Sequence, residues 1–232
     1  MFQFYQENGK YYSRTNNFQH KPLPLARQPG GKRKAPHRRI TYLNIPFLQR
    51  DLIVCESDLE RDCAIIVSLN PEVLRIDAQP QTFDLGIYGQ YTPDFLVTYK
   101  SLPPSYIEAK PDVFAQEPQT WEKILAAHRY FKSNGVVYEL MTDLDIEKKN
   151  RHLNATYIHR CAKLAIPAQQ SQAIIDVVNR YPKGIRVEDL QAITGLLTDH
   201  ILHCVGQRQI TLNHCFEYQP LSMVYPLQGE CK

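Results

Sequence analysis

The stretch Tyr91–Pro111, YTPDFLVTYKSLPPSYIEAKP, decides the fold expected for this chain. It holds two short apolar runs separated by a Leu-Pro-Pro turn at 102–104, which predicts two neighbouring strands. Asp94 precedes the first run, whereas Glu108 and Lys110 lie near the end of the second. Because strand side chains alternate between two faces, Glu108 and Lys110 share one face. The stretch therefore predicts two acids and a lysine side by side.

The residues on either side predict helices that flank these strands. Ser57-Asp58-Leu59-Glu60 fits a capping box, so a helix begins there and ends at Asn70-Pro71. A second helix is expected at residues 118–134, with Gly135 as its C-terminal stop. Strands are expected at residues 73–78, 81–88, 91–99, 106–110 and 136–142. One face of the second helix is expected to carry Trp121, Ile124, Leu125, His128 and Phe131. This order predicts an α/β domain with a mixed sheet over residues 41–145.

A second domain is expected at residues 167–232, after a connector at 146–166. Helical spacing of apolar residues predicts helices at 171–181, 187–194 and 198–205, followed by a strand at 209–212. Two short helices that meet at Gly195 before a strand resemble a helix-turn-helix with a wing. Arg208 is the only base near the helix that would read DNA. A small helical cap without a ligand and a protein-docking module therefore stay open as alternatives.

The basic charge of the chain is concentrated at its start. The net charge is +3, but residues 1–50 hold ten Lys or Arg against Glu7 alone, which leaves the remainder at about −6. Residues 1–40 form an expected basic arm, centred on PGGKRKAPHRR at 29–39, whose composition is typical of segments that follow a phosphate backbone. A solvated tail is the alternative. The candidate DNA-binding residues are Lys32, Arg33, Lys34, Arg38, Arg39 and Arg208.

Composition narrows the class of protein further. The 232 residues are 43% hydrophobic and 22% charged, which is typical of folded globular chains. No apolar run is long enough to span a membrane and the first residues lack a signal-peptide core, so a cytoplasmic protein is expected. Six cysteines without a CxxC pair suit free thiols in a reducing compartment. A zinc site among His200, His203, Cys204, His214 and Cys215 is a weak alternative because no ligand pair repeats.

The acids and the lysine fit the chemistry of phosphodiester hydrolysis. That reaction needs an activated water, neutralisation of the phosphate charge and stabilisation of the leaving oxygen, which Mg²⁺ can supply. Mg²⁺ prefers carboxylate oxygens and keeps several waters, so Asp94, Glu108 and one more acid would suffice. Lys110 would then orient the attacking hydroxide. Glu60 is the first candidate for the third acid, and its substitutes are Glu56, Asp62 and Asp84.

Several motifs together resemble the TnsA endonuclease family, the endonuclease subunits of bacterial cut-and-paste transposons. They are Ser57–Glu60, Gln79-Pro80, Tyr91–Val97, Ile107–Pro111 and the run from Gly135 to Asp143. The resemblance covers residues 40 to about 215. It implies a restriction-endonuclease-like mixed sheet flanked by helices, followed by a small winged-helix-like C-terminal domain.

The resemblance also implies an activity and a set of site residues. By motif position, Glu60, Asp94 and Glu108 become metal ligands and catalytic residues, and Lys110 becomes the catalytic lysine. The implied enzyme nicks the 5′ ends of a transposon, with Mg²⁺ as cofactor and Mn²⁺ able to substitute. Its implied partners are double-stranded DNA at the transposon ends, a TnsB-type transposase and a TnsC-type AAA+ regulator. The family does not always have an acid at the position of Glu108.

Two other functions stay open from the sequence. A stand-alone restriction or repair nuclease of the same fold would cleave DNA without a transposase. A non-catalytic DNA-binding or docking subunit would keep the fold as a scaffold and would tolerate loss of Asp94 or Lys110.

Overall fold

The computed structural model describes residues 4–7, 10–13 and 39–227, and these residues divide into two compact units. The first unit contains residues up to 64 and residues 72–145; the second contains residues 65–71 and those from 146 onward. Lys32, Arg33, Lys34 and Arg38 lie outside the described residues.

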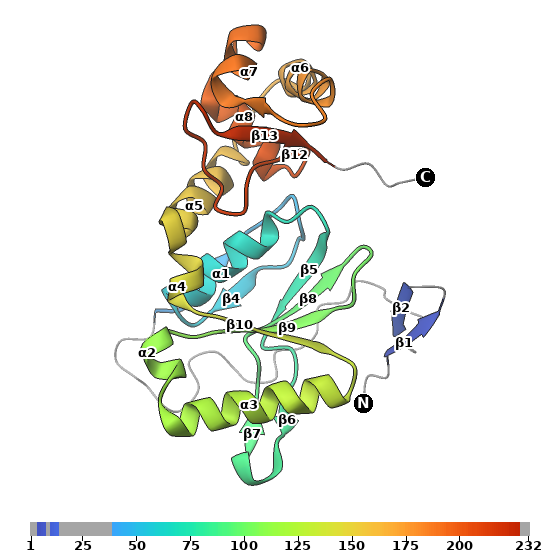
Figure 1. Cartoon of the computed structure of the whole chain (residues 1–232), viewed down its shortest axis with the longest axis vertical. Helices are drawn as coiled ribbons and strands as arrows, with labels where there is room; N and C mark the ends of the chain where they lie inside the picture. The colour runs from blue at the N-terminus through green and yellow to red at the C-terminus, as the bar shows by residue number, and fades with distance from the viewer. Residues whose placement is uncertain (1–3, 8–9, 14–38, 228–232) are drawn as a thin grey trace. The chain divides into compact units, whose positions relative to one another are not determined.

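The first unit is built on a four-stranded mixed sheet with strand order β10-β9-β8-β5 (Figure 1). β5 pairs with β8 and β8 with β9 in antiparallel fashion, whereas β9 and β10 are parallel. The strands are β5 (Val73–Ala78), β8 (Phe95–Tyr99), β9 (Ser105–Ala109) and β10 (Val137–Met141). The mixed α/β sheet expected from the sequence is therefore confirmed.

Two helices pack on opposite faces of this sheet. On one face, Phe131 of α3 (Pro118–Ser133) stacks on Tyr106 of β9 and Tyr138 of β10. On the other, the Sγ of Cys63 in α1 (Asp58–Ser68) lies 3.6 Å from the Sδ of Met141. Alternation along β10 places Tyr138 and Met141 on opposite faces. Both faces of the central strands are thus covered, and all five residues of β9 are buried.

The helix α3 ends as its sequence predicts, but its buried face differs from the expectation. Gly135 has φ +69°, and the N–H of Val136 donates to the carbonyl of Phe131 at 2.9 Å, as in a helix end closed by glycine. Ile124 and Phe131 are buried, whereas Trp121 and His128 are exposed. The contact stripe also takes in Ala126 and Ala127, whose small side chains allow close approach to the sheet.

Two strand predictions were wrong in detail. The expected strand at 81–88 is only the short β6 (Phe83–Asp84), followed by a 3₁₀ turn at Gly86–Tyr88. The glycines at 86 and 89 have φ values of +66° and +73°, which break a strand. The expected strand at 91–99 is interrupted between β7 (Gln90–Tyr91) and β8. β6 and β7 form a hairpin beside α3 (Figure 1).

Short elements complete the first unit. Two further hairpins are each formed by a pair of antiparallel strands. The remaining elements are β1 (Phe4–Glu7), β2 (Lys10–Ser13), β3 (Thr41–Leu43), β4 (Ile53–Cys55), α2 (Asp112–Ala115) and α4 (Asp143–Ile146).

Within residues 146–227, the second unit combines four helices with a small sheet of order β11-β13-β12. β13 pairs antiparallel with both neighbours. In chain order, a 3₁₀ turn at Lys148–Asn150 precedes α5 (Arg151–Cys161), α6 (Ala168–Asn179), β11 (Ile185–Arg186), α7 (Val187–Thr194), α8 (Thr198–Gly206), β12 (Ile210–Thr211) and β13 (Met223–Pro226). Of the helices in the described part of the chain, none is long and apolar enough to cross a membrane.

Candidate active site

Asp94 and Glu108 face each other across two antiparallel strands. Phe95 of β8 pairs with Ile107 of β9, so the same register places Asp94 opposite Glu108 and on the same face of the sheet. The two carboxylates are only 8% and 7% exposed. The N–H of Ala109 donates to Oδ2 of Asp94 at 2.9 Å. The pair of acids expected from the sequence is therefore brought together where β8 begins and β9 ends, in the middle of the sheet.

The backbone of Asp94 is held by Gln79, from the Gln-Pro motif. The N–H of Gln79 donates to the carbonyl of Asp94 at 2.7 Å. Gln79 is buried and adopts a left-handed φ of +44°. This bond fixes the main chain immediately before β8, where the acid must be positioned.

Glu60 lies at the beginning of α1 and forms the expected cap. The N–H of Glu60 donates to Oγ of Ser57 at 3.1 Å, and the Ser57 hydroxyl donates to Oε1 of Glu60 at 3.1 Å. Oε2 of Glu60 accepts the N–H of Glu56 at 2.7 Å, one residue before the position of an ordinary capping box. Glu60 thus has a structural task whether or not it also binds a cation.

Lys110 follows the last residue of β9 and reaches back to Glu108. Its Nζ lies 3.4 Å from Oε1 of Glu108. The backbone N–H of Lys110 donates to the carbonyl of Met141 at 3.1 Å, which continues the pairing with β10 beyond the strand end. The ammonium is half-buried beside an acid, where it can contribute positive charge to a bound phosphate.

Tyr91 contacts Glu108 and Tyr138 contacts Tyr91, and the sequence did not single out either tyrosine. The hydroxyl of Tyr91 donates to Oε2 of Glu108 at 2.8 Å and lies 2.6 Å from the hydroxyl of Tyr138. Burial, followed by the charge of Glu108, raises the pKa of Tyr91, so its hydroxyl keeps its proton and acts as a donor. Burial likewise raises the pKa of Tyr138, and Glu108 adds to this effect. Tyr91 was visible as the first residue of the deciding stretch, but its partner is 47 residues away.

The electrostatics of the site are dominated by crowded negative charge. Burial raises the pKa of Asp94 well above its ordinary range, and the charges of Glu108 and Glu60 raise it further. The Ala109 N–H and Lys110 oppose this shift. Burial and then the charges of Glu60 and Asp94 also raise the pKa of Cys55, so this thiol stays protonated and is a poor nucleophile. Asp94 therefore interacts with both Glu108 and Glu60.

The donor chemistry of this site fits a divalent cation such as Mg²⁺. Its donors are carboxylate oxygens, which Mg²⁺ prefers, and a cation would relieve the mutual repulsion that raises the pKa of Asp94. Yet within residues 4–7, 10–13 and 39–227, no three His, Cys, Asp or Glu side chains are grouped to hold a metal. Both oxygens of Glu60 accept hydrogen bonds at the start of α1.

The substitute acids have other contacts. Asp62 accepts bonds from the guanidinium of Arg61 at 2.8 and 3.0 Å. Asp84 accepts the N–H of Gly86 at 2.9 Å and shapes the tip of the β6–β7 hairpin. Glu56 is buried directly before the Ser57 cap. Neither Asp62 nor Asp84 matches Glu60 in its interaction with Asp94, whose pKa responds to Glu60.

Two of the expected DNA-binding residues fall within the described chain. Arg39 is exposed. Arg208 is half-buried with a left-handed φ of +59°, and burial lowers the pKa of its guanidinium. The roles of these two arginines in DNA binding stay predictions.

Two residues of the weak zinc alternative, His203 and Cys204, have separate contacts in the second unit. His203 is buried, with its Nδ1 3.1 Å from the carbonyl of Cys161. The thiol of Cys204 lies 3.9 Å from the carbonyl of Ser171.

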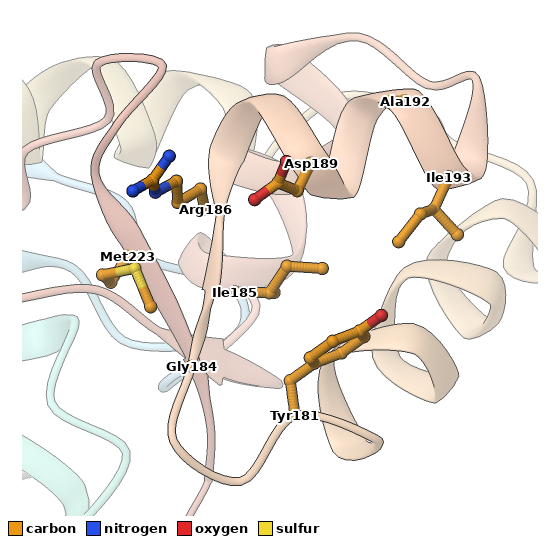
Figure 2. Close-up of a pocket in the computed structure, with 8 residues that line it drawn as sticks. All are labelled: Tyr181, Gly184, Ile185, Arg186, Asp189, Ala192, Ile193 and Met223. Atoms are coloured by element: carbon orange, nitrogen blue, oxygen red, sulfur yellow. The ribbon is translucent and has the colours of Figure 1, made fainter.

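A pocket of about 530 Å³ lies in the second unit, between α7 and the β11–β13 strands (Figure 2). Its charged lining residues are Arg186 and Asp189; the others are Tyr181, Gly184, Ile185, Ala192, Ile193 and Met223. Arg186 lies 3.5 Å from Glu188. An apolar, partly aromatic lining with one acid and one base suits binding of a side chain better than bond-breaking chemistry.

Fold and site together define a class: a mixed α/β domain with two opposed carboxylates and a lysine at the ends of adjacent strands. A comparison with protein-family models finds a match within that class. Residues 70–143 match the model described as TnsA-like endonuclease N terminal, so this segment is similar to a TnsA-like endonuclease domain. The match includes Asp94, Glu108 and Lys110, whereas Glu60 precedes it. A comparison with curated proteins finds no match.

Proposed function

We propose that this chain is a Mg²⁺-dependent DNA endonuclease that nicks the 5′ ends of a transposon together with a TnsB-type transposase. The observation that carries the proposal is the TnsA-like match over residues 70–143, which contains the opposed pair Asp94 and Glu108 and the adjacent Lys110. The same family match supports a transposon-associated nuclease over a repair enzyme.

The residues of the site have distinct tasks in this proposal. Asp94 and Glu108, with Glu60 as the third acid, would hold Mg²⁺, or Mn²⁺ in its place. The cation, when bound, supplies charge neutralisation on the phosphate and a lower pKa for a coordinated water. Lys110 lies beside Glu108, where its ammonium orients the attacking hydroxide and offsets developing negative charge. Burial of the carboxylates excludes bulk water and strengthens each of these interactions.

The second unit is proposed to be a winged-helix domain that docks onto protein partners. Its order of α6, β11, α7, α8, β12 and β13, with β13 central in the sheet, supports that fold. The sequence of α8, TDHILHCVG, contains no Lys or Arg, which disfavours base reading by this helix. Docking to a TnsB-type transposase or a TnsC-type AAA+ regulator accords better with this charge and with the pocket of Figure 2, whose lining mixes apolar side chains with Arg186 and Asp189.

A cleavage assay on a labelled transposon-end duplex tests the proposal. The substrate carries a label on either strand, and the transposase is added so that nicks can be mapped on each strand. The wild-type chain is expected to cut at the 5′ end and leave a 3′-OH and a 5′-phosphate. The Lys110→Ala variant is expected to assemble with the transposase but not to cut.

Lys100→Ala is the matched control, because Lys100 is exposed just beyond the opposite end of β8. Equal 5′-end cutting by the Lys110→Ala and wild-type chains would contradict the mechanism and favour a non-catalytic subunit. Cutting at the same rate without the transposase would favour a stand-alone nuclease.

A further inference from the structure

The feature that the proposed chemistry does not yet use is the pair of tyrosine hydroxyls behind Glu108. Tyr91 comes from β7 and Tyr138 from β10, so the pair is assembled from two strands that are not neighbours in sequence. The hydroxyl of Tyr91 is 2.8 Å from Oε2 of Glu108 and 2.6 Å from the hydroxyl of Tyr138. The pair therefore extends the acidic site by two residues.

The Glu108 carboxylate fixes which hydroxyl donates in each of these two hydrogen bonds. A carboxylate can only accept, so Tyr91 must donate its single proton to Glu108. The oxygen of Tyr91 is then available only as an acceptor, and the proton between the two hydroxyls must come from Tyr138. Each hydroxyl thus polarises the next, which strengthens the bond that reaches Glu108.

The aromatic surroundings hold the pair rigidly. The ring of Tyr138 stacks on Phe131 with a centroid distance of 5.4 Å and an interplanar angle of 6°. The rings of Tyr91 and Tyr138 meet at 6.2 Å. Tyr91 is buried, and Phe131 belongs to the same apolar cluster. Because its ring is packed in this cluster, the Tyr91 hydroxyl has a fixed position and can set the rotation of the carboxylate that it contacts.

The two oxygens of Glu108 are consequently distinguished. Oε2 accepts the Tyr91 hydroxyl, and Oε1 faces the Nζ of Lys110 at 3.4 Å. Rotation of the carboxylate would exchange these oxygens and disturb Asp94, which stands opposite Glu108. Residues that hydrogen-bond a metal ligand without touching the metal commonly change its affinity by about 10- to 100-fold.

We infer that Tyr91, supported by Tyr138, is a positioning residue that fixes the Glu108 carboxylate for cation binding. This inference rests on the proposed function, because it assigns residues that hold a proposed metal ligand in place. Tyr91→Phe removes the donor and keeps the ring, and Tyr138→Phe removes the supporting hydroxyl.

Tyr106→Phe is the matched control. Tyr106 is buried in the same aromatic cluster and stacks on Phe131 at 4.7 Å. Among the hydrogen bonds of the described residues, none joins Tyr106 to Glu108. The control therefore reports the loss of a buried hydroxyl without the loss of a contact to the acid.

The test measures Mn²⁺ affinity of the full chain without DNA, from the free-Mn²⁺ signal in electron paramagnetic resonance, alongside nicking. Tyr91→Phe is expected to weaken Mn²⁺ binding by about 10- to 100-fold, Tyr138→Phe by less, and Tyr106→Phe by less than about twofold. In a Glu108→Gln background, Tyr91→Phe is expected to cause no further loss, because the two residues act as one unit.

Equal Mn²⁺ affinity in Tyr91→Phe and Tyr106→Phe would overturn the inference. So would a further loss in the Glu108→Gln background, which would show that Tyr91 acts elsewhere. Neither result touches the proposed function, which fails instead if Asp94→Ala or Lys110→Ala nicks transposon ends like the wild-type chain.

Discussion

Replacement of Asp94 by Asn is expected to stabilise the metal-free protein while it removes nicking. Asn keeps the shape of Asp and can still accept the N–H of Ala109 through its amide oxygen. What it removes is one negative charge from a buried site. In the folded protein, burial and the charges of Glu108 and Glu60 raise the pKa of Asp94 above its ordinary value of 3.8.

The sign of the stability effect follows from this shift. Because the folded state holds the Asp94 proton more tightly than the unfolded state, stability falls as the pH rises from about 3.8 towards the raised folded pKa. Above that window the ionised carboxylate destabilises the fold. Each 1 kcal/mol that Asn recovers would raise Tm by about 2–4 °C in a chain of this size.

Added metal is expected to make the wild-type protein more stable than Asp94→Asn, the reverse of the order without metal. A cation at 100 times its Kd stabilises the wild-type fold by about 2.7 kcal/mol, whereas Asp94→Asn should gain little. Nicking is expected to fall by about 10³-fold, which corresponds to about 4 kcal/mol of lost transition-state stabilisation.

Thermal unfolding in EDTA and in Mg²⁺, followed by a nicking assay, checks both effects on the same samples. Asp176→Asn is the control, since Asp176 is an exposed carboxylate on α6 of the second unit. A lower Tm for Asp94→Asn in EDTA would refute the electrostatic reasoning. Metal stabilisation equal to that of the wild-type chain would refute the assignment of Asp94 as a ligand.

Three further predictions concern α1 and the second unit. Ser57→Ala should cost about 1 kcal/mol in urea unfolding because it removes the cap of α1, yet it should keep nicking in conditions where it is folded. Glu60→Gln retains an amide oxygen that can accept the Glu56 N–H, so it should lose less stability than Ser57→Ala but should weaken nicking. If Ser57→Ala loses nicking and Glu60→Gln does not, Glu60 acts only as a cap. Gly206→Ala should lower the free energy of unfolding by about 1–3 kcal/mol, because its Cβ would meet the Cβ of Ala162 at 2.5 Å and the carbonyl of Ile158 at 2.9 Å. An unchanged urea midpoint would show that α5 and α8 can separate without cost.

The arrangement of the central acids could be predicted because it depends on local periodicity. Alternation along β9 places Glu108 and Lys110 on one face, and the short turn before β9 favours an antiparallel pair with β8. The start of α1 was equally local, since the Ser57 hydroxyl and Glu60 are three residues apart. In each case the interacting groups belong to one short segment.

Contacts between distant segments could not be predicted in this way. Tyr91 and Tyr138 meet only because β10 lies parallel to β9 and brings its side chains over the same face. The expected strand at 81–88 failed because glycines at 86 and 89 adopt left-handed φ values that apolar alternation does not reveal. Trp121 was expected on the buried face of α3, but it is 46% exposed, whereas Ala126 and Ala127 are buried.

The central claim is that Asp94 and Glu108 hold one divalent cation, and anomalous scattering from Mn²⁺ tests it most directly. Crystals of the full chain grown with Mn²⁺ are expected to show an anomalous peak within coordination distance of both carboxylates, close to Lys110. The peak should vanish in Asp94→Asn and persist in the Asp176→Asn control. A Mn²⁺ peak elsewhere in the crystal without one beside Asp94 and Glu108 would contradict the account.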